Sequence, residues 1–259
     1  MKRALVTGAG KRLGRAMAQY LAQRGFDVAI HYAASADEAK DLAADLAQMG
    51  RRAPLLQADL LDESATQALL PAAADALGGP ITCLVNNASI FEYDNITTAT
   101  RSSWDRHFES NLRAPFVLTQ AMAAAIPAPL PDDMGEPVAQ GLVVNMIDQR
   151  VRKLTPEFMT YTLAKMGLWA FTQTAAQALA PKIRVNAIGP GPTLQGGRQS
   201  LDHFTRQRQS TVLQRGANPN DITAALGFFL DSPSVTGQLM CCDGGQHLGW
   251  QTPDVLGVE

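Results

Sequence analysis

The sequence predicts an α/β fold, namely a doubly wound parallel sheet of seven strands with helices on both faces. Three observations predict it. Short apolar runs alternate with helical patterns along the chain, a glycine-rich turn joins the first run to the first helix, and neither a repeat nor a linker divides the sequence. We therefore expect a single domain over residues 1–259, with right-handed crossovers between its strands.

The first strand–helix–strand unit has the clearest pattern. Residues 4–6 form a short apolar run that a glycine-rich turn follows, as is typical of a buried strand. Apolar residues at positions 13, 16, 17, 20 and 21 form the stripe of an amphipathic helix, and Gly25 follows as its C-cap. Residues 27–32 then have the pattern of a second strand.

The same reasoning predicts the later elements. Further strands are expected over residues 55–58, 82–85, 141–146, 183–188 and 239–242. Further helices are expected over residues 36–49, 62–77, 101–126, 157–180 and 218–230. Asp62 and the pair Asn218–Pro219 are good helix starters, because they satisfy or remove unpaired backbone N–H groups. The stretch 127–140 is rich in proline and acidic residues, so we expect a surface loop there.

Composition excludes several classes of protein. Lys plus Arg number 22 against 24 acidic residues, and the net charge of −2 disfavours a nucleic-acid or anionic-membrane partner. The three cysteines form no disulfide framework, which favours a reducing, cytoplasmic location. The longest uncharged stretch, residues 114–131, contains four prolines and is no membrane span. The scattered histidines have no metal-ligand spacing, so no metal site is expected.

The turn Thr7–Gly14 has the character of a dinucleotide phosphate site. Its glycines allow close backbone approach, and the helix N-terminus after it favours anions. The site residues expected here are Gly8, Lys11, Arg12, Leu13 and Gly14. The second strand is followed by no acid before Asp37, so nothing is placed to hold a ribose 2′-hydroxyl. Together with the nearby cations Lys11 and Arg12, this absence favours NADP(H) over NAD(H). The alternative for the two cations is that they are simply solvated, and the alternative for the turn is that it binds no ligand.

A tyrosine and a lysine share one face of the predicted helix 157–180. Tyr161 and Lys165 are four residues apart, which puts phenol and ammonium side by side. A nearby cation favours the phenolate, so we expect the pKa of Tyr161 to be lowered and the phenol to exchange a proton. The alternative is an ordinary exposed helix surface.

Together these motifs resemble the short-chain dehydrogenase/reductase family, which has the Rossmann fold. The resemblance extends over nearly the whole chain, including the C-terminal segments 236–238 and 243–245. It implies roles for residues beyond the phosphate turn. Asp59 would lie on the adenine side, Asn87 and Ala88 beside the ribose, Pro190 and Gly191 beside the nicotinamide, and Asn111 would position Lys165 through water.

Two departures from the family pattern are informative. Arg12 stands where the family has glycine, and Asp148 stands where it has serine, thirteen residues before Tyr161. An ionised carboxylate only accepts hydrogen bonds, so Asp148 suits a substrate that offers N–H donors or needs a proton from a carboxylic acid. Both departures occur in the pteridine reductase and dihydromonapterin reductase branch, which this sequence resembles.

The branch resemblance implies a substrate site. Ser89 and Phe91 match a serine and an aromatic residue that sandwiches the pterin, and Asp148, Tyr161 and Lys165 match its catalytic set. The alternative for Phe91 is core packing. Some members have an arginine after the second strand; here His31 and Ser35 would take over the 2′-phosphate with the two cations of the turn. Residues 246–250 also lack a C-terminal arginine that some members have.

The sequence therefore predicts an NADPH-dependent reductase that transfers a hydride to a C=N or C=O group, with a pterin as substrate. The alternatives are a reductase or dehydrogenase of ketones, sugars or oxoacyl groups, and an NADP(H)-binding protein without catalysis. The family implies a homotetramer with helices 101–126 and 157–180 at an interface. The arginine-rich stretch 198–215 lies where the family has its lid, although a solvated helical face is the simpler reading.

Overall fold

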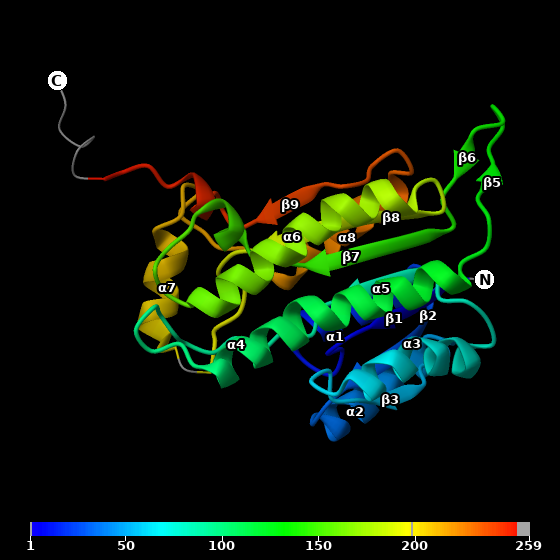
Figure 1. The fold of residues 1–259 in the computed structure, drawn as a ribbon, viewed down its shortest axis with the longest axis horizontal. Helices are drawn as coiled ribbons and strands as arrows, with labels where there is room; N and C mark the ends of the chain where they lie inside the picture. The colour runs from blue at the N-terminus through cyan, green and yellow to red at the C-terminus, as the bar shows by residue number, and fades with distance from the viewer. Residues whose placement is uncertain (1, 198, 253–259) are drawn as a thin grey trace.

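The computed structural model describes residues 2–197 and 199–252, and its centre is a seven-stranded sheet (Figure 1). The strand order is β3-β2-β1-β4-β7-β8-β9, and every neighbouring pair is parallel. The strands are β1 (Arg3–Val6), β2 (Asp27–Tyr32), β3 (Leu55–Gln57), β4 (Cys83–Asn86), β7 (Gly141–Met146), β8 (Ile183–Pro190) and β9 (Leu239–Cys242). The order reverses between β1 and β4, and open α/β sheets bind ligands at such a point.

Helices cover both faces of this sheet. The α-helices are α1 (Arg12–Gln23), α2 (Ala36–Gln48), α3 (Glu63–Leu77), α4 (Arg101–Phe108), α5 (Ala114–Ala125), α6 (Met159–Leu179), α7 (Leu201–Gln209) and α8 (Pro219–Asp231). Helices α1, α2 and α8 bury one hydrophobic cluster against the sheet, and α3, α5 and α6 bury another on the opposite face. The predicted doubly wound architecture is confirmed, with one hydrophobic core on each face of the sheet.

Most predicted elements lie where the sequence places them, because their end signals are local. The strands over 27–32, 141–146 and 239–242 have the expected bounds. Asp62 caps α3, since its carboxylate accepts from the backbone N–H groups of Ser64 and Ala65.

Two expectations were wrong in detail. The stretch 127–140 is no plain loop: β5 (Leu130–Pro131) and β6 (Pro137–Val138) form a small antiparallel hairpin, whose turn is held by the Asp132 side chain accepting from two backbone N–H groups. The single helix expected over 101–126 is divided by a π-helical turn at Glu109–Arg113. Within residues 2–197 and 199–252, no helix has the length and apolar character needed to cross a membrane.

Candidate active site

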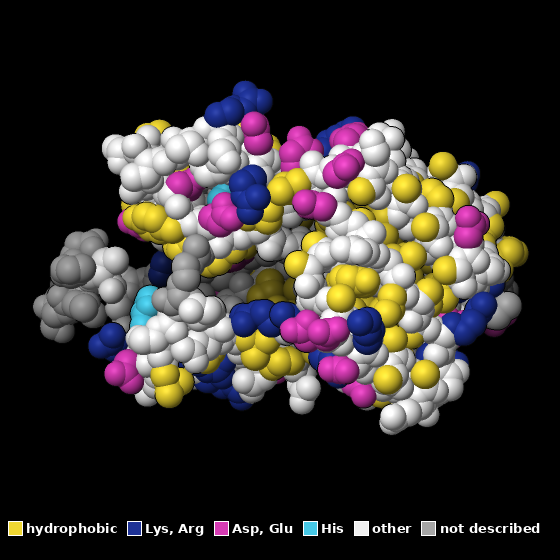
Figure 2. Space-filling view, turned by 90° about the horizontal axis from the view of Figure 1, so that it is seen from below, with side chains coloured by type: hydrophobic (Ala, Val, Ile, Leu, Met, Phe, Trp, Pro, Cys, Tyr) yellow, Lys and Arg dark blue, Asp and Glu magenta, His cyan; other side chains and the backbone are white. Residues whose placement is uncertain are grey.

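Two cavities lie at the carboxyl ends of the strands, beside the point where the strand order reverses. One, of about 280 Å³, is lined by residues that include Gly8, His31 and Asp59. The other, of about 230 Å³, is lined by residues that include Phe91 and Asp148. Seen from below, the molecule is hollowed on the side where these strands end (Figure 2). Each cavity is thus lined by residues far apart in the sequence.

The phosphate turn packs closely, with glycine required at Gly14 and favoured at Gly8. Gly8 has φ +62°, and a Cβ at Gly14 would lie 2.2 Å from the Gly8 carbonyl oxygen. His31 supports the turn from beneath: its Nδ1 accepts from the Gly8 N–H at 3.0 Å, and its Nε2 donates to the Ala58 carbonyl at 3.1 Å. Since His31 is buried and both its nitrogens are used, it shapes the cofactor turn from within the fold.

The side chains of Asn87 and Thr7 tie the end of β4 to the same turn. Asn87 Nδ2 donates to the carbonyl oxygens of Thr7 at 2.8 Å and Gly8 at 3.1 Å. Thr7 Oγ1 accepts from the N–H groups of Asn87 and Ala88, both at 2.9 Å. The start of the turn is therefore fixed to the segment after β4, and Ala88 lies on the wall of the larger cavity together with Asp59.

Lys11 and Ser35 lie at the outer rim of the turn. Lys11 Nζ is 2.6 Å from a carboxylate oxygen of Glu38, and both side chains are largely exposed. A Cβ at Gly10 would lie 2.8 Å from Ser35 Oγ, so the Ser35 hydroxyl borders the turn. The rim therefore offers one cation and one hydroxyl to an anion, with Glu38 as a competing acid that the sequence analysis did not assign.

Arg12 adopts the left-handed conformation, with φ +54°, at the position where the family has glycine. A side chain in this conformation costs about 1 kcal/mol or more. The guanidinium donates to the carbonyl oxygens of Gln195 at 2.8 Å and Leu194 at 3.0 Å. Arg12 thus links the cofactor turn to the loop after β8, and Leu13 beside it lines the smaller cavity.

The turn after β8, which the resemblance places beside the nicotinamide, is also tight. A Cβ at Gly191 would lie 2.6 Å from the Cβ of Asp243, so only glycine fits there. The Gly191 N–H donates to the Cys242 carbonyl at 3.0 Å. Pro190 and Gly191 line the smaller cavity, on the same wall as Asp148.

Asp148 and Tyr161 are joined by a direct hydrogen bond. The Tyr161 hydroxyl donates to Asp148 Oδ2 at 3.0 Å, and the Arg150 N–H donates to Asp148 Oδ1 at 2.8 Å. Lys165 Nζ donates to the Met146 carbonyl at 2.8 Å and lies 5.7 Å from the centre of the Tyr161 ring. The structure therefore brings the three predicted catalytic side chains together, between β7 and α6.

Burial controls the protonation of this group. It raises the pKa of Asp148, although the Arg150 N–H and nearby cations oppose the shift. Burial and the Asp148 carboxylate raise the pKa of Tyr161, so the expectation of a lowered phenol pKa was wrong for this state. Burial also lowers the pKa of Lys165 to about 8. The physical reason is that desolvation outweighs the attraction of a single cation.

Asn111 lies in the π-helical turn, which turns its side chain to the strand end. Its Nδ2 donates to the Ile90 carbonyl at 2.8 Å, and its Oδ1 accepts from the Ile90 N–H at 2.9 Å. The side chain thus holds the loop that carries the predicted substrate residues. Its expected role toward Lys165 through water stays a prediction.

Phe91 is a wall of the smaller cavity, and the core-packing alternative was wrong. Its ring is 44% exposed and stacks on Phe158, with centroids 4.3 Å apart and planes 10° apart. The Tyr161 ring packs edge-on against Phe91, with centroids 4.7 Å apart. Ser89 hydrogen-bonds the Tyr161 phenol and acts to lower the pKa of that phenol.

Sequence reasoning missed two residues of this site. Phe158 carries φ +56° and supports the Phe91 ring, and no sequence pattern marks it. Gln149 directly follows Asp148, is 7% exposed and lines the smaller cavity. Its Oε1 is buried and has no hydrogen-bond partner among the described residues. Only its place next to Asp148 could have suggested it.

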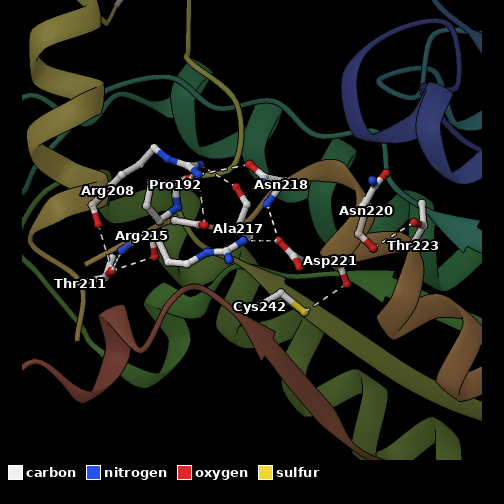
Figure 3. A network of polar contacts seen from close by, with 11 residues as sticks. Pro192, Arg208, Thr211, Arg215, Ala217, Asn218, Asn220, Asp221, Thr223 and Cys242 are labelled. Carbon is white, nitrogen blue, oxygen red and sulfur yellow. Dashed lines mark hydrogen bonds and ion pairs between the residues drawn. The ribbon is translucent and has the colours of Figure 1, made fainter. Parts of the chain in front are cut away.

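The arginine-rich stretch forms α7 and the segments around it, and Arg208 is held there by several contacts (Figure 3). Its guanidinium donates to the carbonyl oxygens of Pro192, Gly216 and Ala217 and to Asn218 Oδ1, at 2.6–3.2 Å. The simple reading of a solvated face is therefore wrong for Arg208. Arg198, counted in the same stretch, lies outside the described residues.

Comparison with known proteins places this arrangement in a family. The family described as short chain dehydrogenase matches residues 2–205. Alternative dihydrofolate reductase 1 (FolM) from Brucella suis, solved in complex with NADP, is 44% identical, with a TM-score of 0.91 and 98% of each chain covered. A short chain dehydrogenase from Burkholderia cenocepacia, also solved with NADP, is 32% identical with a TM-score of 0.84, over 95% of this chain and 97% of the other.

Relatives with other stated activities are also similar. The 3-oxoacyl-[acyl-carrier-protein] reductase of Staphylococcus aureus is 28% identical over 252 residues, which cover 95% of this chain and 98% of that protein. An uncharacterised oxidoreductase of Methylorubrum extorquens is 30% identical over 252 residues, with 94% and 97% covered. The similarity to these four proteins extends over nearly the full length of the fold described above. The chain therefore belongs to the short-chain dehydrogenase family.

Proposed function

We propose that this protein is an NADPH-dependent reductase of a pterin, of the dihydropteridine, dihydromonapterin or dihydrofolate type. The observation that carries the proposal is the half-buried Asp148, which stands in place of the family's serine and accepts a hydrogen bond from the Tyr161 hydroxyl. The FolM relatives support it, because proteins named alternative dihydrofolate reductase are 44% identical to this chain and were solved with NADP.

The chain fits the cofactor. The glycines Gly8 and Gly14 let the turn pack closely against itself and Asn87, and the start of α1 has no side-chain cap, so its first N–H groups are available to a pyrophosphate. Lys11 and Ser35 would hold the 2′-phosphate at the rim, and Pro190 with Gly191 would flank the nicotinamide. Bound NADPH supplies the hydride.

The protein's own residues bind and protonate the substrate. While Asp148 is protonated it can donate to a ring nitrogen, and the raised pKa extends that state to higher pH. Once ionised it accepts N–H groups. A pterin offers ring and amino N–H groups on one edge, whereas a simple ketone offers none.

The shape of the cavity favours a flat substrate. The Phe91 ring is fixed by stacking on Phe158 and remains 44% exposed. A flat heteroaromatic ring gains about 1 kcal/mol from stacking on such a face, beyond its area burial. Phe91 and Tyr161 would therefore hold the pterin plane beside the residues that protonate it.

An NADPH-oxidation assay tests the proposal. We expect dihydrobiopterin, dihydromonapterin or dihydrofolate to be reduced with a kcat/KM at least about tenfold above that of a panel of ketones, sugars and 3-oxoacyl thioesters. Asp148→Ser should lower the pterin value by about a hundredfold, which corresponds to about 2.7 kcal/mol. Turnover of the ketone panel alone would overturn the pterin assignment, and turnover of no substrate would favour a protein that only binds NADP(H).

A further inference from the structure

Helix α6, which carries Tyr161, starts without a cap of its own. The residue before it, Phe158, is in the left-handed conformation and supplies no side-chain hydrogen bond to the helix. Instead, Asp94 serves the first turn from the loop after β4. Its carbonyl accepts from the Met159 N–H at 3.3 Å, and its Oδ1 accepts from the Thr160 N–H at 3.1 Å. An anion at a helix N-terminus is also favoured by the helix dipole.

The same carboxylate ends a chain of hydrogen bonds whose direction is fixed. The Glu92 N–H can only donate, so His107 Nε2 accepts it, at 3.1 Å. The neutral His107 ring then carries its proton on Nδ1 and donates to Thr160 Oγ1, at 2.7 Å. The Thr160 hydroxyl donates in turn to Asp94 Oδ2. Each group in the chain has one role, and none can be reversed without breaking a neighbouring bond.

This chain of hydrogen bonds is buried and contacts the catalytic tyrosine, Tyr161. Asp94 and Thr160 are each 2% exposed and His107 is fully buried. The His107 ring packs edge-on against the Tyr161 ring, with centroids 5.9 Å apart and planes at 72°. Thr160 is the residue before Tyr161, and Glu92 is the residue after Phe91. The chain thus joins the two segments that supply the proton-transfer group and the substrate wall.

We propose that Asp94, Thr160 and His107 are positioning residues. They hold Tyr161 and the Phe91 segment in the relative position that catalysis requires. The proposal rests on the proposed function in that Tyr161 is taken as the proton-transfer group. Loss of the register would displace the phenol from Asp148 while leaving the phosphate turn, on the other side of the site, intact. The expected defect is therefore in kcat and substrate KM and not in cofactor binding.

Thr160 offers a matched pair of variants. Thr160→Val keeps the shape but leaves the Asp94 oxygen and the His107 N–H without their partner, whereas Thr160→Ser keeps the hydroxyl. We expect Thr160→Val to lower kcat at least about tenfold, or about 1.4 kcal/mol in activation free energy, with the Kd for NADPH within about twofold of the wild type. Thr160→Ser should retain kcat within about threefold. Equal kcat in Thr160→Val and wild type, or an equal loss in both variants, would overturn the proposal.

Nitrogen NMR of His107 gives a readout that needs neither activity nor a variant. The wild-type enzyme should show His107 as the neutral tautomer with the proton on Nδ1, and the proton on Nε2 would overturn the proposal even where Thr160→Val does not fold. Asp94→Asn should leave this tautomer unchanged, because the Glu92 N–H still requires His107 Nε2 as its acceptor.

The two proposals fail in different ways. If the wild type reduces no pterin but reduces a ketone, the proposed function fails, and the Thr160 variants are then compared on that ketone. If the wild type reduces pterins and Thr160→Val matches it, the positioning role alone fails. If nothing is reduced, the positioning role is tested by the His107 tautomer and by the NMR chemical shifts of the Tyr161 ring. Tyr161 chemical shifts in the Thr160→Val protein that equal those of the wild type would contradict the positioning role.

Discussion

Asp148 is half-buried and Tyr161 is buried, and the two titratable groups share one hydrogen bond, 3.0 Å long. In a family that has serine at this position, the hydroxyl stays neutral at every accessible pH. Here the raised pKa of Asp148 makes the protonation state depend on pH, and burial is the cause. A single substitution thus replaces a hydroxyl, which donates and accepts at every pH, by a carboxyl group that donates only while it is protonated and only accepts once it is ionised.

Asp148→Asn should remove a pH dependence of stability. Because the folded-state pKa of Asp148 lies above its unfolded value, its contribution to stability is full below the unfolded pKa and is lost as the pH rises through the folded pKa. The wild-type Tm should therefore fall relative to that of the variant as the pH rises from about 4 to 8. Thermal unfolding of both proteins measures this, with the exposed Asp75→Asn as control. Parallel Tm curves for wild type and Asp148→Asn would contradict the expectation.

Substitutions at the rim of the phosphate turn should change the preference between NADPH and NADH. Lys11 is paired with Glu38 at 2.6 Å, and the Lys11 side chain lowers the pKa of that carboxyl. Lys11→Ala should raise the KM for NADPH about tenfold, because one charge-assisted contact is lost, and leave that for NADH nearly unchanged. Glu38→Gln should lower the KM for NADPH, since the competing acid is gone. Steady-state kinetics with both cofactors decides, and an equal change for NADPH and NADH would exclude a role at the 2′-phosphate.

The elements around the site show where local patterns predict well and where they do not. The caps at Asp62 and Asn218 are local, and the structure confirms them. The π-helical turn at Glu109–Arg113 has no such local signal: Asn111 bonds Ile90, which lies 21 residues earlier, and helical periodicity runs through the turn unchanged. Secondary structure was thus predicted correctly where the hydrogen-bond partners that define an element lie near each other in the sequence.

Arg208 on α7 gives a prediction at the scale of the element. Its guanidinium joins this helix to the loop after β8 and to the segment before α8 (Figure 3). Arg208→Ala should lower the free energy of unfolding by about 3 kcal/mol, because several buried acceptors lose a charged donor. Chemical denaturation measures this loss, and Arg206→Ala, exposed on the same helix, is the control. Equal stabilities for the two variants would show that α7 does not depend on Arg208.

The molecule as a whole leaves apolar side chains exposed on α4, α5 and α6. Trp104 is 42% exposed, Phe116 40% and Leu163 44%. We propose that these helices form an interface of a homotetramer, as the family resemblance implies. Exposed patches of this kind are typical of interaction surfaces.

Phe116→Glu should therefore shift the mass in solution to a smaller species, because a charge would be buried at the interface. Light scattering after size-exclusion chromatography measures the mass. Met134→Glu is the control, since Met134 is exposed on the β5–β6 hairpin, away from those helices. A wild-type monomer, or a Phe116→Glu protein of unchanged mass, would contradict the proposed interface.

The sequence by itself determined the architecture and indicated most of the candidate site residues that the structure brings together. Apolar periodicity and caps are local properties, so the strand–helix alternation, the phosphate turn and the Tyr161–Lys165 pair could be predicted in advance. Asp148 stood out because one residue departs from an otherwise regular pattern. These features depend on neighbours within a few positions in the chain.

Only the tertiary structure decided how those residues are protonated and held. The pKa of Tyr161 is raised, not lowered, because burial depends on what packs around the phenol. The contacts of Asp94 with Thr160 and of Arg12 with Gln195 join positions 66 and 183 residues apart. Desolvation and long-range hydrogen bonds exist only once the chain has folded, and no spacing in the sequence encodes them.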